Sequence, residues 1–120
     1  MKFYKCNKCG KIITFINETA IPTVCCGEAM KEIVAGTVEA SREKHIPVYA
    51  LNGDTLEVVV GSIEHPMLPE HFIEWIAVET KSGYQIKYLK PNDLPKVEFK
   101  VNEEIIGVYA YCNLHGLWKA

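Results

Sequence analysis

The stretch "FIEWIAVETKSGYQIKYL", residues 72–89, has the pattern of a β-hairpin. Apolar and aromatic residues alternate with polar ones on both sides of Ser82-Gly83, a pair of residue types common in tight turns. Strict alternation divides the first run between two faces, with Ile73, Trp75 and Ala77 on one and Phe72, Ile76 and Val78 on the other. The stretch therefore predicts two paired strands.

Three further stretches carry the same kind of signal. "VYALNGDTLEVVVG" (48–61) holds two strand candidates around Asn52-Gly53, and "KVEFKV" (96–101) alternates apolar residues with charge. "EEIIGVYAYC" (103–112) is rich in β-branched and aromatic residues, as buried strands are. Because short strands follow one another with turn residues between them and no stretch has a helical period, the sequence predicts an all-β sandwich.

Length and composition narrow the class of protein. A chain of 120 residues is about one ordinary domain, with room for a small appendage. A net charge of -2 gives no basic surface, which argues against nucleic acid and anionic membrane as partners. We find neither an apolar run long enough to span a bilayer nor a signal peptide, so we expect a cytoplasmic protein. An odd number of cysteines, 5, in a reducing compartment favours metal binding over disulfides.

The first 35 or so residues hold two cysteine-bearing turns, "KCNKCGKIITF" (5–15) and "TVCCGEAMKEI" (23–33). The segment has too few apolar residues to offset the conformational entropy of folding, so a metal is the natural cross-link. Its candidate ligands are Cys6, Cys9, Cys25 and Cys26. Spacing alone favours structural zinc first, iron second and a redox disulfide last. Since the second pair is adjacent rather than C-x-x-C, we expect a distorted tetrahedron.

A second set of donors follows in the β part: His45, His65, His71, Cys112 and His115. Any one of these histidines alone is more often a surface or core residue than a ligand. Together they flank proline-stiffened loops and the turn after the last long strand, where sites on a rigid sandwich are built. Five nitrogen and sulfur donors exceed the four that zinc takes and suit iron with one open position, the histidines in a plane and the thiolate on the axis. Such a site would activate a small oxygen species.

The full pattern is C-x-x-C, fifteen residues, C-C, then E-K-H, E-H-P, E-H-F and C-N-x-H. It resembles the desulfoferrodoxin family of superoxide reductases over essentially the whole chain and accounts for every cysteine and histidine. The resemblance implies a mostly β protein in two domains. Residues 1–36 would form a desulforedoxin-like, rubredoxin-like iron–thiolate domain, and residues 37–120 an immunoglobulin-like β-sandwich holding a mononuclear iron.

The resemblance also implies an activity. Superoxide would be reduced by one electron to hydrogen peroxide at the iron with four histidines and one cysteine, in defence against oxygen stress. Glu43 would cap the oxidised iron and Lys44 would attract the anion, although without the family both read as an exposed charge pair. The family expectation for the electron donor is a rubredoxin, and we expect a homodimer. The alternatives are superoxide dismutation and a non-enzymatic module, stapled by zinc or carrying electrons.

Overall fold

The computed structural model describes residues 1–120, and all of its regular structure except one short helix is β-strand. The prediction of a mostly β protein is therefore confirmed. The chain divides into two compact units, Met1–Val34 and Ala35–Ala120. None of its helices has the length and apolar character needed to cross a membrane.

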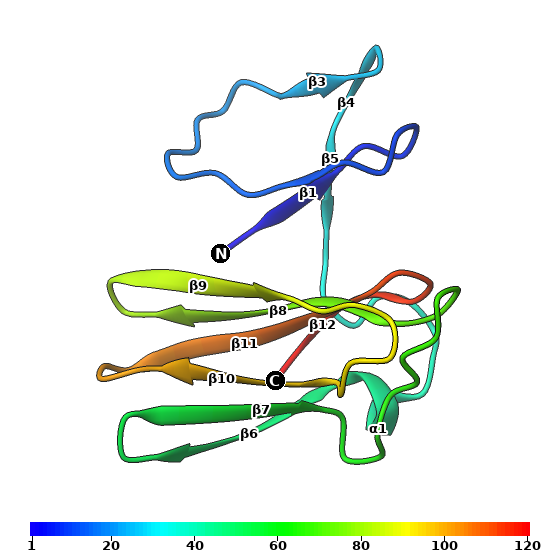
Figure 1. Ribbon diagram of the computed structural model, residues 1–120. Helices are drawn as coiled ribbons and strands as arrows, with labels where there is room; N and C mark the ends of the chain where they lie inside the picture. The colour runs from blue at the N-terminus through cyan, green and yellow to red at the C-terminus, as the bar shows by residue number, and fades with distance from the viewer. The chain divides into compact units, whose positions relative to one another are not determined.

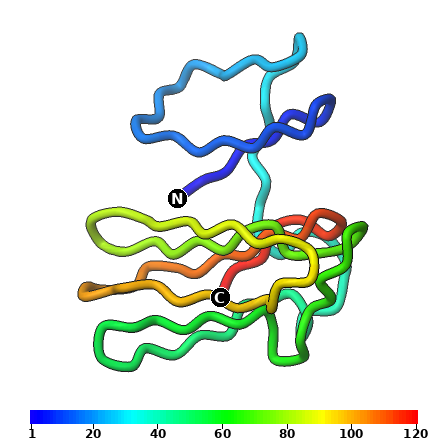
Figure 2. Tube along the Cα trace, in the orientation of Figure 1, coloured from blue at the N-terminus to red at the C-terminus, as the bar shows by residue number.

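The first unit is built from five short strands. They are β1 (Phe3–Lys5), β2 (Ile12–Ile13), β3 (Val24–Cys25), β4 (Glu28–Ala29) and β5 (Lys31–Ile33). A three-stranded sheet has the order β2-β1-β5, and β3 and β4 form a separate hairpin. Long loops make up much of the remainder, as Figure 2 shows. Ile16, Ile21 and Val24 are 89%, 79% and 65% exposed, and only Phe3, Cys6 and Met30 are buried, so this unit has very little apolar core.

The second unit is the predicted β-sandwich, with two antiparallel sheets (Figure 1). One sheet has the order β10-β7-β6 and the other the order β12-β11-β8-β9. The strands are β6 (Pro47–Asn52), β7 (Thr55–Val60), β8 (Ile73–Thr80), β9 (Gly83–Tyr88), β10 (Lys96–Lys100), β11 (Ile105–Cys112) and β12 (Gly116–Lys119). The helix α1 (Arg42–His45) comes before β6.

The core of the sandwich lies between the two sheets. Leu56 and Val58 of β7 and Phe99 of β10 face Ile76 of β8 and Val108 of β11, and all five are at most 1% exposed. Alternation is strict in β7 and β10, whose outward residues are mainly polar or charged. Burial of each large apolar side chain in the core stabilises the fold by about 1.5–3 kcal/mol.

Two details differ from the sequence prediction. The hairpin turns lie at residues 53–54 and 81–82, one residue away from the expected dipeptides in each case. A register shift between β8 and β11, opposite Tyr111 and Cys112, moves Ile73 into the core beside Cys112. The prediction that Ile73 shares a face with Trp75 is wrong. It assumes strict alternation, whereas a β-bulge places one extra residue of β8 between Ile73 and Trp75.

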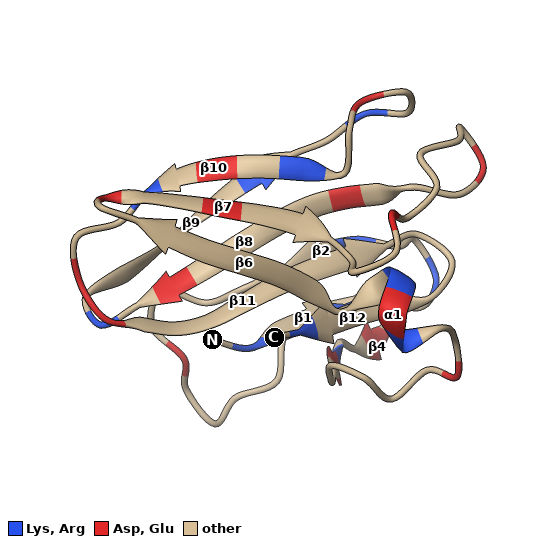
Figure 3. Ribbon diagram, turned by 90° about the horizontal axis from the view of Figure 1, so that it is seen from below, with Lys and Arg blue, Asp and Glu red and all other residues tan.

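Helix α1 was not expected from the sequence. Its four residues are packed against Gly61, which follows β7, so closely that a Cβ at that position would lie 2.6 Å from the carbonyl oxygen of Glu43. Figure 3 shows the mixed charges on this short helix. The helix, the end of β7, the start of β8 and the turn from β11 to β12 all lie at one end of the sandwich.

Candidate metal centres

The first unit brings four cysteine sulfurs together. The Sγ atoms of Cys6, Cys9, Cys25 and Cys26 all lie within 4.8 Å of one another. Cys9 and Cys25 are 3.6 Å apart, and Cys25 and Cys26 are 4.0 Å apart. A metal–sulfur bond of about 2.3 Å gives about 3.8 Å between sulfurs at the corners of a tetrahedron. The group therefore has the size of a closed four-thiolate metal site.

The backbone makes room for the adjacent pair of cysteines. Cys26 has φ 53°, in the left-handed region that residues other than glycine rarely adopt, and Gly27 follows with φ 78°. In the other turn, the amide of Gly10 donates to the carbonyl of Cys6 at 2.9 Å. The distortion expected from the vicinal cysteines thus falls on the backbone at Cys26, while the two sulfur separations stay near the tetrahedral value.

The close approach of the four thiols and of backbone N–H groups shifts the pKa values of two cysteines in opposite directions. The backbone N–H of Cys9 lowers the pKa of Cys6 to about 6, whereas the Cys9 side chain raises the pKa of Cys25 to about 12. One thiol is thus readily ionised while its neighbour resists a second negative charge. A bound cation removes this conflict, because metal binding deprotonates coordinating thiols.

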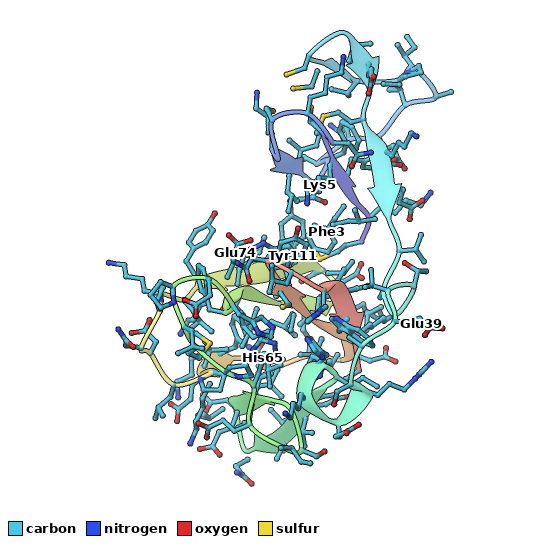
Figure 4. The ribbon with its side chains drawn as sticks, turned by 90° about the vertical axis from the view of Figure 1, so that its right-hand side faces the viewer. Phe3, Lys5, Glu39, His65, Glu74 and Tyr111 are labelled. Carbon is cyan, nitrogen blue, oxygen red and sulfur yellow. The ribbon has the colours of Figure 1, made fainter.

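The second unit brings four imidazole rings into a square. Centroids of neighbouring rings are 4.6 Å apart for His45 and His65, 4.7 Å for His65 and His71, 5.0 Å for His71 and His115, and 4.9 Å for His115 and His45. Neighbouring rings meet at 75–89°. The diagonal from His45 to His71 is 6.4 Å, close to the roughly 6.8 Å of a square with sides of about 4.8 Å. Figure 4 shows His65 in the interior of this unit.

The separations between ring nitrogens distinguish a square from a tetrahedron. His45 Nε2 lies 3.1 Å from His65 Nε2 and 3.1 Å from His115 Nδ1. Metal–nitrogen bonds of about 2.1 Å place neighbouring nitrogens about 3.0 Å apart at 90° and about 3.4 Å apart at tetrahedral corners. Cys112 Sγ lies 3.8 Å from His115 Nδ1 and within 4.8 Å of the ligand atoms of the other three histidines. The arrangement is a square of four imidazole rings with one sulfur beside it.

Backbone carbonyls orient two of the rings. The Nδ1–H of His45 donates to the carbonyl of Ser41 and that of His65 to the carbonyl of Pro66, each at 2.6 Å. These bonds fix the tautomer, so that the bare Nε2 of each ring points into the square. His71 Nε2 is buried with no hydrogen-bond partner. A buried nitrogen without a partner is costly unless it binds a metal, and this one is placed to do so.

Burial also sets the charges of the free site. It lowers the pKa of His65 to about 4 and lowers the pKa of His45 and His71 as well. All three rings are therefore neutral near pH 7, the state that binds metal. Burial raises the pKa of Cys112, partly opposed by the backbone N–H groups of His115 and Leu114. The donor set fits a metal cation, which would ionise the thiol.

Glu43 and Lys44 lie on α1 directly before His45, and both are exposed. After burial and the other histidines, the positive charge of Lys44 also contributes to lowering the pKa of His45 and His71. These two rings lie at opposite corners of the square, so the charge of Lys44 affects both sides of the site. The backbone N–H of Glu43 lowers the pKa of its own carboxyl. The pair therefore places one cation and one carboxylate beside the imidazoles.

The sequence predicts the metal-ligating side chains but not the backbone groups that orient them. The orienting carbonyls of Ser41 and Pro66 have no sequence signature, because every residue has a carbonyl. Asn113 is part of the C-N-x-H pattern, but the sequence does not show which groups its side chain bonds.

A closed site of four thiolates and a square of four imidazoles beside a thiolate, carried on an all-β chain, define a protein with two non-haem metal centres. Residues 37–120 match the family model described as Desulfoferrodoxin, and residues 1–33 match that of its N-terminal domain. The chain belongs to the desulfoferrodoxin family, and its two sites match the two iron centres of that family.

Relatives cover the whole chain. A desulfoferrodoxin homolog of Archaeoglobus fulgidus is 42% identical over 120 residues, which are 100% of this chain and 96% of the relative. The desulfoferrodoxin of Nitratidesulfovibrio vulgaris is 41% identical, over 99% of this chain and 94% of the relative. Among solved structures, the superoxide reductase of Treponema pallidum matches with a TM-score of 0.82 and 34% identity, covering 99% of this chain and 97% of that one.

Proposed function

We propose that this protein is a superoxide reductase. In the reaction, one superoxide anion takes up one electron and two protons to give hydrogen peroxide, with no release of dioxygen. The observation that carries the proposal is the square of imidazoles with a buried sulfur beside it, next to the charge of Lys44. The similar protein from Treponema pallidum is a superoxide reductase.

We assign the iron ligands to His45, His65, His71, Cys112 and His115. Iron held by these residues would supply the electron, and a set of five protein donors suits a metal that also takes a small anion. The neutral rings of His45, His65 and His71 would add no charge of their own, and the Cys112 thiolate would donate electron density to the metal. Enclosure of Cys112, which is 0% exposed, keeps water from competing for its sulfur.

Lys44 and Glu43 are proposed to act on the substrate side. The exposed ammonium of Lys44 attracts superoxide to a chain whose net charge is negative, and donates hydrogen bonds to the anion. The Glu43 carboxylate is ionised near pH 7, and its own backbone N–H lowers its pKa further below the ordinary 4.5. We propose that it closes the open position after turnover.

The four-cysteine centre has no vacant position, so its proposed role is to carry electrons. A rubredoxin-like protein is the proposed donor, and the proposed assembly is a homodimer. All five cysteines are free, which suits the reducing cytoplasm, where defence against superoxide would be its role.

The decisive experiment compares Lys44→Ala with Lys81→Ala. His71 precedes the first residue of β8 and Lys81 follows the last. The length of the strand therefore separates Lys81 from the imidazoles by about 25 Å, well beyond the Debye length of about 8 Å. We expect Lys44→Ala to slow the second-order reaction with superoxide by at least about tenfold and to flatten its dependence on salt. Lys81→Ala should change neither quantity. Pulse radiolysis over a salt series measures the second-order rate constant and its salt dependence for both variants.

Two further measurements separate this function from its alternatives. Peroxide formed without dioxygen distinguishes reduction from dismutation. Cys112→Ser should abolish the sulfur-to-iron absorption band of the second centre and most of the activity, while the spectrum of the first centre persists. Zinc in both sites of the native protein, or normal superoxide reduction by Cys112→Ser, would refute the proposal.

A further inference from the structure

The four imidazoles differ in what holds them. The rings of His45 and His65 are fixed by backbone carbonyls at 2.6 Å, and the carbonyl of His115 accepts a hydrogen bond from Trp118 Nε1 at 3.0 Å inside a tight hairpin. No hydrogen bond orients the ring of His71, whose Nε2 is buried without a partner. Its position therefore depends on the backbone of the loop that precedes β8.

The amide and carbonyl of His71 pair with those of Leu68 within the loop, at 3.0 and 2.9 Å. The residues on either side of His71 are held from another strand by Asn113, which follows the ligand Cys112. The side-chain Nδ2 of Asn113 donates to the carbonyl of Glu70 at 3.0 Å, and its Oδ1 accepts from the amide of Phe72 at 3.0 Å. The Asn113 backbone amide donates to the carbonyl of Phe72 at 3.2 Å. The residues on both sides of His71 are thus bound to one side chain.

The chemistry of these partners requires a primary amide. A carbonyl oxygen needs a donor and an amide N–H needs an acceptor, and the short Asn side chain presents one of each at the correct spacing. A carboxylate in its place would keep the bond from Phe72 but would set an oxygen against the carbonyl of Glu70. An alanine would lose both side-chain bonds.

We propose that Asn113 is a positioning residue of the second centre, fixing His71 relative to Cys112. Because it follows a ligand on β11 and holds both neighbours of a ligand from another loop, it sets how the square lies relative to the sulfur. Groups that orient metal ligands are typically worth about 10–100-fold in metal affinity or activity. The inference rests on the metal site and not on the identity of the reaction.

The test follows iron release to a chelator from the purified two-iron protein, comparing Asn113→Asp, Asn113→Ala and the control Asn102→Ala. Asn102 is exposed in the loop between β10 and β11. We expect both Asn113 variants to lose the second iron about 10–100-fold faster than the control. The four-cysteine iron in the same molecules should be released at the wild-type rate.

Electron paramagnetic resonance of the oxidised second iron gives a readout that stability alone does not move. Its rhombicity should change in Asn113→Asp, because a displaced His71 lowers the symmetry of the square. Release rates and spectra equal to those of Asn102→Ala would overturn the proposal. So would loss of the cooperative thermal transition in both Asn113 variants, since Asn113 would then act on the fold as a whole. A wild-type protein without a second iron would instead refute the metal site itself.

Discussion

Replacing Gly61 with alanine is expected to displace α1 and damage the second centre. The added Cβ would lie 2.6 Å from the carbonyl oxygen of Glu43 and 2.9 Å from that of Ile46. Real Cβ atoms essentially never approach other atoms within 3.0 Å, and both oxygens belong to the backbone, so no side chain can rotate away. The helix that carries Glu43, Lys44 and His45 must therefore move.

The size of the effect follows from these distances. Ordinary contact begins at 3.4 Å, so the carbonyl of Glu43 must retreat by about 0.8 Å (3.4 − 2.6 Å). Overpacking of this kind costs about 1–3 kcal/mol, which lowers Tm by about 4–24 °C for a domain of this size. Because a shift of about 1 Å in a catalytic group can reduce a rate about 100-fold, the reaction with superoxide should slow by about 10–100-fold.

Gly83→Ala is the matched control, since a Cβ at the start of β9 meets nothing within 4 Å. Thermal unfolding followed by circular dichroism, the content of the second iron and the superoxide rate are measured for both variants. If Gly61→Ala matched Gly83→Ala in all three, the close packing of α1 on Gly61 would have no bearing on the site.

Three other changes test separate parts of the molecule. Cys9→Ser should lose the first iron and leave the bimolecular reaction with superoxide nearly unchanged, and a large loss of rate with the second iron still bound would show that the catalytic centre is misassigned. Phe99→Ala should lower the free energy of unfolding by about 3–5 kcal/mol in urea titrations, because the ring is 1% exposed in the core. Hydrogen bonds from Thr80 and Ser82 lower the pKa of Glu103, so its contribution to stability is present above its ordinary pKa of 4.5 and disappears as the pH falls through the lowered value. Glu103→Gln should therefore flatten the loss of stability as the pH falls below 4.5, and an unchanged acid slope would contradict this.

The sequence predicts the role of a residue where that role depends on the type of its side chain. Thiols and imidazoles at ligand spacing predicted both donor sets, and alternation predicted the strands of the sandwich. Helix α1 escaped detection because four residues are too short for a helical period. The inward position of Ile73 depends on a bulge against β11, which only the paired strand reveals. The pattern C-N-x-H contains Asn113, but its role could not be predicted because its side-chain partners are backbone atoms distant in sequence.

The two centres differ in how far solvent reaches their sulfurs. Cys9 and Cys26 are exposed, whereas Cys112 is fully enclosed. A thiolate that has lost its metal is oxidised where an oxidant can reach it, first to a sulfenic acid and then, with a neighbouring thiol, to a disulfide. Cys9 and Cys25, with their sulfurs 3.6 Å apart, are placed for that reaction. Iron lost from the first centre in the presence of peroxide can therefore return only after that disulfide has been reduced, whereas the enclosed thiol of the second centre stays ready to bind metal again.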